Sequence, residues 1–115
     1  MVTIPRERFD VLVVDALDQI PDPLASMMDN VAVFVEDGSS GGALLGRYDG
    51  VPLTQRDEGY SGMVMPDRIT VFRRPICAQC RDEPEVVRQV LVTVVHEVAH
   101  HFGIDDDRLH ELGWG

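Results

Sequence analysis

The run PEVVRQVLVTVVHEVAHHFG, residues 84–103, restricts the fold more than any other part of the sequence. Its apolar residues recur at helical spacing, and Pro84 with its acidic neighbours Glu83 and Glu85 is typical of a helix start. Gly103 stands where a helix commonly ends, because glycine adopts the left-handed conformation of that position without strain. The run therefore predicts one long helix that begins at about Glu83 or Pro84 and ends before Gly103.

This helix carries the pattern His-Glu-x-x-His at residues 96–100. Because residues four apart lie on one face of a helix, His96 and His100 are expected to direct both imidazoles at one metal ion. Glu97 can reach a metal-bound water without binding the metal, take its proton and leave a hydroxide that attacks a carbonyl group. With only three fixed residues, the pattern alone is also compatible with a helix end that faces solvent.

The residues that follow the pattern favour the metal site. The full string is His-Glu-x-x-His-x-x-Gly-x-x-Asp, and a catalytic zinc normally has three protein ligands and one open position. After Gly103 turns the chain back, Asp106 can return a carboxylate to the same ion. One aspartate of the triplet must also cap the short helix predicted in DDRLHEL. We therefore expect Asp106 to be the third zinc ligand and Asp105 or Asp107 the cap, with Glu111 as a further carboxylate in reach.

The string HEVAHHFGIDDDRLHELG, with VAVFVED, LLGRYDGVPLTQR, GYSG and PDRITVFRRPI upstream, resembles the small bacterial zincin-like metallopeptidase family over about residues 30–115. The resemblance implies a minimal zincin fold, with both histidines and Asp106 at a zinc ion and Glu97 as the base. It also implies a peptide or protein substrate, because larger zincins hold an extended peptide along the strand edge before the active-site helix. RITVFRR, residues 68–74, is expected to supply that edge.

The remaining segments predict an α+β fold, with a small sheet packed on the long helix in a single domain of residues 1–115. An N-terminal helix is expected after Thr3, its N-cap, with Pro5 in the first turn, and a short helical turn is expected over Leu24–Met28. NVAVFVED and DRITVFRR are predicted strands, and shorter ones are expected at LLGRY and VPL. PICAQCRDEPEV is expected to be a turn-rich connector.

Two alternatives keep the histidines but change the chemistry. Cys77 and Cys80, with His96 and His100, match the loose spacing of a structural Cys2His2 zinc site, which is closed and holds no water to activate. About three turns of helix before His96, which place Cys80 roughly 20 Å away, oppose this alternative. The other alternative is a non-catalytic metal-binding or interaction module.

The charge balance argues against other classes of protein. Twenty acidic and ten basic side chains give a formal charge of −10, which opposes binding to nucleic-acid phosphates or anionic lipid. The longest apolar runs, Val11–Val14 and Val90–Val95, are far shorter than the roughly 20 residues of a membrane span. The start MVTIPRERFD also lacks the apolar stretch of a signal peptide. We therefore expect a cytoplasmic protein without nucleic-acid or membrane partners, whose peptide substrate is neutral or basic.

Overall fold

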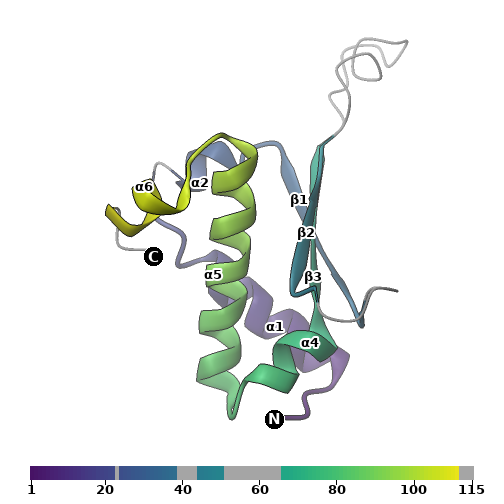
Figure 1. Cartoon of the computed structure of the whole chain (residues 1–115). Coiled ribbons are helices and arrows are strands. Elements are labelled where there is room, and N and C mark those ends of the chain that lie inside the picture. The colour runs from purple at the N-terminus through teal and green to yellow at the C-terminus, as the bar shows by residue number, and fades with distance from the viewer. Residues whose placement is uncertain (23, 39–43, 51–65, 112–115) are drawn as a thin grey trace, which may run out of the picture.

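The computed structural model describes residues 1–22, 24–38, 44–50 and 66–111 (Figure 1). In these ranges five helices and a three-stranded sheet form a small α+β fold, as the sequence predicts. The elements in chain order are α1 (Arg6–Leu17), α2 (Leu24–Met27), β1 (Val31–Glu36), β2 (Gly46–Asp49), β3 (Asp67–Phe72), α4 (Arg73–Gln79), α5 (Glu83–His101) and α6 (Asp106–Glu111). The predicted strand VPL lies outside the described residues.

The strand order of the sheet is β1-β3-β2, so β3 is the central strand. It pairs in parallel with β1 and antiparallel with β2, where Tyr48 lies opposite Ile69. The prediction that RITVFRR supplies a free edge is therefore wrong. The physical reason for the central place of β3 is burial. Of its six residues only Arg68 is exposed, as expected for a strand covered on both faces. Among the described strands β1 and β2 are the edge strands, and β2 is the one that packs on α5.

Helix α5 is the element on which the rest of the domain packs. It contacts α1, β2, β3, α2 and α4, and Figure 1 shows it alongside the sheet, with α1 crossing its lower half. Its buried side chains form one continuous face: Val86, Val90, Leu91, Thr93, Val94, Val95, Val98 and Ala99. This packing fixes the direction of the opposite face, which carries His96 and His100.

Helix α5 begins at Glu83, where the sequence predicts its start, and two interactions hold this end. Asp82 is the N-cap, and its carboxylate accepts a hydrogen bond of 3.0 Å from the backbone N–H of Glu85. Arg8 of α1 pairs with Glu83 at 2.7 Å. The hydrogen bond from Arg8 lowers the pKa of Glu83. Because the folded pKa is the lower one, this pair stabilises the protein at neutral pH, and its contribution is lost as the pH falls through that pKa.

Two segments differ from the prediction. Helix α1 begins at Arg6 with Pro5 as its N-cap, so Thr3 does not cap it. The predicted connector PICAQC is instead mostly helix α4, which follows β3 directly. Pro75 lies in the first turn of α4, where the absence of an N–H does no harm, and burial of Ile76 and Cys77 stabilises the helix against the core. Among the described residues, no helix is both long and apolar enough to cross a membrane.

Candidate metal centre

Helix α5 ends at His101, and a Schellman motif with Gly103 terminates it. Gly103 has a positive φ of 81°, which an L side chain would adopt only with strain. Its N–H donates to the carbonyl of His100 at 3.1 Å, and the N–H of Ile104 donates to the carbonyl of Ala99 at 2.8 Å. These two bonds satisfy the last carbonyls of α5 and reverse the chain, as the sequence predicts.

Asp105 and Asp106 have different roles at the start of α6. The carboxylate of Asp105 accepts a hydrogen bond of 2.9 Å from the backbone N–H of Arg108, so Asp105 is the N-cap. Leu109 is fully buried and holds α6 against the core. Asp106, the first residue of the helix, therefore has a side chain that the cap does not require.

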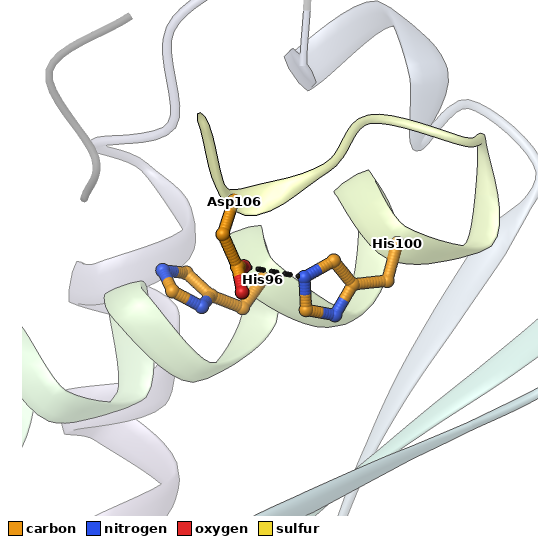
Figure 2. Close-up of side chains that lie close together, drawn as sticks. All are labelled: His96, His100 and Asp106. Atoms are coloured by element: carbon orange, nitrogen blue, oxygen red, sulfur yellow. Dashed lines mark hydrogen bonds and ion pairs between the residues drawn. The ribbon is translucent and has the colours of Figure 1, made fainter. Parts of the chain in front are cut away.

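The side chains of His96, His100 and Asp106 lie close together (Figure 2). His100 Nε2 and Asp106 Oδ1 lie 2.8 Å apart, and the rings of His96 and His100 have centroids 5.8 Å apart at an interplanar angle of 65°. One ligand atom from each of the three residues lies within 4.8 Å of the other two. Two ligands of one tetrahedral zinc are about 3.3 Å apart for bonds of about 2.0 Å, so small side-chain movements bring the donors to that spacing.

The cluster is open on one side. The side chains of His100 and Asp106 are 48% and 79% exposed, whereas His96 is half-buried. Within the described ranges, this cluster is also the one group of three or more potential metal ligands. Two imidazoles, one carboxylate and access from solvent are the features of a three-ligand zinc site with an open position.

Glu97 lies beside the cluster and is not part of it. It lines a groove of about 280 Å³ together with His96, between α5 and the start of β2. The other lining residues are Leu44, Leu45, Gly46, Gln89, Val92 and Thr93. A molecule in this groove would therefore contact β2, His96 and Glu97 at once.

The contact between β2 and α5 depends on a glycine that sequence reasoning did not single out. A Cβ at Gly46 would lie 2.6 Å from Thr93 Cγ2, 3.2 Å from the carbonyl oxygen of Thr70 and 3.9 Å from Glu97 Cγ. Only a residue without a side chain allows the strand to approach the helix so closely. Gly46 was recognised from the structure, because nothing local in LLGRY indicates the distant partner Thr93.

Replacement of Gly46 by alanine is expected to lower the free energy of unfolding by about 1–3 kcal/mol, the usual cost of overpacking. The new methyl group meets backbone as well as side chain, so β2 must move. Gly38→Ala is the matched control, because a Cβ at Gly38 meets nothing within 4 Å. Urea unfolding of the two variants measures the difference, and equal stability would show that the close approach is not required.

The geometry is incompatible with a Cys2His2 site. Cys80 ends α4 and Cys77 lies within it, whereas His96 follows thirteen residues after the first residue of α5, about 20 Å along the helix axis. Both cysteines are buried free thiols, and burial raises the pKa of each. They pack the core beside the start of α5 and cannot share an ion with the histidines.

The remaining carboxylate considered as a ligand has another partner. Glu111 accepts a hydrogen bond of 2.8 Å from Arg108, three residues earlier on α6. This ion pair lies on an exposed surface, and Glu111 is not in the cluster of potential ligands. Asp106 is therefore the carboxylate that the fold brings to the histidines.

Residues 28–114 match the profile of the zincin-like metallopeptidase family, and the chain belongs to that family. The match includes the sheet, α5 and α6, and therefore every residue of the candidate metal centre. No curated protein matches the chain.

Proposed function

We propose that the protein is a zinc-dependent peptidase in which His96, His100 and Asp106 bind the metal and Glu97 is the general base. The observation that carries this proposal is the closeness of the three donors to one another beside a glutamate that lines a groove next to β2, an edge strand of the described sheet. Membership of the zincin-like metallopeptidase family supports the same reaction class.

The donor set fits zinc. Two neutral imidazoles and one carboxylate form a borderline-soft set of three ligands, which leaves one position open. A bound zinc ion lowers the pKa of water toward about 7 and polarises a carbonyl oxygen. Asp106 can supply the carboxylate of this set because Gly103 turns the chain back toward the histidines and Asp105, not Asp106, caps α6.

Glu97 carries out the proton transfers in this proposal. Its place in the groove, next to His96, lets the carboxylate accept a proton from the attacking water. The same carboxyl group then donates that proton to the leaving amine, so that Glu97 returns to its starting form and the peptide bond is broken. The groove lining next to this carboxylate also includes the apolar residues Leu44, Leu45 and Val92, on which an apolar substrate side chain can pack.

The substrate in this proposal is an extended peptide along β2. Among the described strands β2 pairs with β3 alone, and in this proposal its other edge offers backbone donors and acceptors for strand addition. The formal charge of −10 favours neutral or basic peptides. Two reduced cysteines, Cys77 and Cys80, suit a protein of the cytoplasm.

Metal analysis paired with a peptide-library digest tests the proposal. We expect one zinc per purified chain, cleavage of a subset of library peptides, loss of cleavage after chelation and recovery on addition of zinc. A protein that binds one zinc and cleaves no peptide would be a metal-binding module, and the peptidase assignment would be wrong.

A further inference from the structure

A second side-chain cluster joins the edge strand to the end of the metal-site helix. The hydroxyl of Tyr48 donates a hydrogen bond of 2.7 Å to Asp67 Oδ2. The ring of Tyr48 stacks on that of His101, with centroids 3.9 Å apart and an interplanar angle of 17°. His101 Nε2 lies 3.7 Å from the same Asp67 oxygen, and the Asp67 side chain is only 11% exposed.

The three residues come from three elements that meet beside the candidate metal centre. Tyr48 lies on β2, Asp67 is the first residue of β3 and His101 is the last residue of α5. His101 directly follows His100 and lies one turn beyond Glu97 on the same face of the helix. A displacement of this cluster would therefore move the edge strand relative to the proposed base.

Within the described ranges, the other side chains of strand β2 make few contacts with the rest of the fold. The strand is four residues long, and β3 is its neighbour in the part of the sheet that the structure describes. Arg47 and Asp49 are exposed and pair with each other at 3.0 Å, and Gly46 has no side chain. Tyr48 is thus the one side chain of β2 that reaches toward the interior.

At both ends of β2 a glycine lies close to helix α5. A Cβ at Gly46 would lie 2.6 Å from Thr93 Cγ2, and a Cβ at Gly50 would lie 3.2 Å from His101 Cε1. Thr93, Glu97 and His101 are spaced four apart and form one stripe of α5. The strand therefore follows the stripe whose middle member is Glu97.

We propose that Tyr48, Asp67 and His101 are positioning residues that hold β2 in place beside Glu97, so that a peptide paired with the strand presents its scissile bond to the metal centre. This inference rests on the proposed peptidase function. The three residues act through the strand and touch neither metal nor reacting atoms.

The test compares Tyr48→Phe with Arg47→Ala, its matched control on the exposed side of the same strand. Tyr48→Phe keeps the ring stack and removes the bond to Asp67. We expect amide hydrogen exchange of residues 44–50 to become about fivefold faster in Tyr48→Phe, the effect of one lost hydrogen bond. Arg47→Ala is expected to exchange like the unmodified protein, because its ion pair is exposed.

Kinetics on the zinc-loaded proteins supply the second measurement. We expect KM for a cleaved peptide to rise about fivefold in Tyr48→Phe, with kcat and zinc affinity within about twofold of the unmodified protein. His101→Phe, which retains an aromatic ring for the stack, is expected to raise KM less than His101→Ala does. A role in general stability alone would lower the melting temperature and leave the KM of the folded enzyme unchanged.

The possible outcomes separate the two proposals. If the unmodified protein cleaves nothing, the proposed function fails, while exchange at residues 44–50 still decides whether Tyr48 anchors the strand. Unchanged exchange in Tyr48→Phe would overturn the positioning role even in an active peptidase. An unchanged KM with faster exchange would overturn the link between strand position and substrate binding.

Discussion

Replacement of Glu97 by glutamine is expected to lower kcat for peptide hydrolysis by about 10²- to 10⁴-fold, the usual contribution of a general base. The amide has nearly the same size as the carboxylate but cannot accept a proton from water. Because Glu97 lies outside the cluster formed by His96, His100 and Asp106, zinc content is expected to stay at one per chain. Steady-state kinetics and metal analysis on one preparation measure both quantities.

The matched control for this experiment is Glu111→Gln. Glu111 is an exposed carboxylate on α6 that pairs with Arg108, so its replacement is expected to change neither turnover nor zinc content. A Glu97→Gln protein with undiminished turnover would remove Glu97 from the mechanism. Loss of zinc in the same variant would instead indicate that Glu97 is a ligand.

The path of the chain around the candidate metal centre was predictable because it depends on residues close together in sequence. The helical spacing of His96 and His100, the left-handed turn at Gly103 and the cap at Asp105 each involve neighbours within one or two turns. Spacings, turns and caps of this kind depend on the local sequence and on helix geometry, not on contacts with distant segments. The sequence accordingly predicted where α5 ends and which aspartate would lie beside the histidines.

The environment of that centre was not predictable, because it depends on pairing between distant segments. RITVFRR has the composition of a strand, but composition does not indicate whether a strand has one neighbour or two, and β3 proved to be central. Likewise, no local pattern links Tyr48 to Asp67 or His101. The close contact of Gly46 with Thr93 is also visible only in three dimensions.

Alanine substitution along the aspartate triplet is expected to separate metal binding from helix capping. Asp106→Ala removes a proposed ligand, and we expect zinc affinity to fall by more than about a hundredfold, because even the partners of ligands contribute about 10- to 100-fold. Asp105→Ala removes the cap of α6, which costs about 1 kcal/mol of stability. Asp107→Ala, at an exposed position, is expected to change neither property.

Zinc affinity is measured by competition with a chromophoric chelator, and stability by denaturation in the presence of EDTA, so that lost metal does not register as lost stability. We expect the loss of zinc affinity and the loss of stability in different variants. The Asp105 carboxylate accepts the hydrogen bond that caps α6, whereas Asp106 Oδ1 lies 2.8 Å from His100 Nε2. If Asp105→Ala lost zinc while Asp106→Ala retained it, the two roles would be exchanged and the proposed ligand set would be wrong. Equal zinc affinity in all three variants would show that the histidines bind the metal without help from this turn.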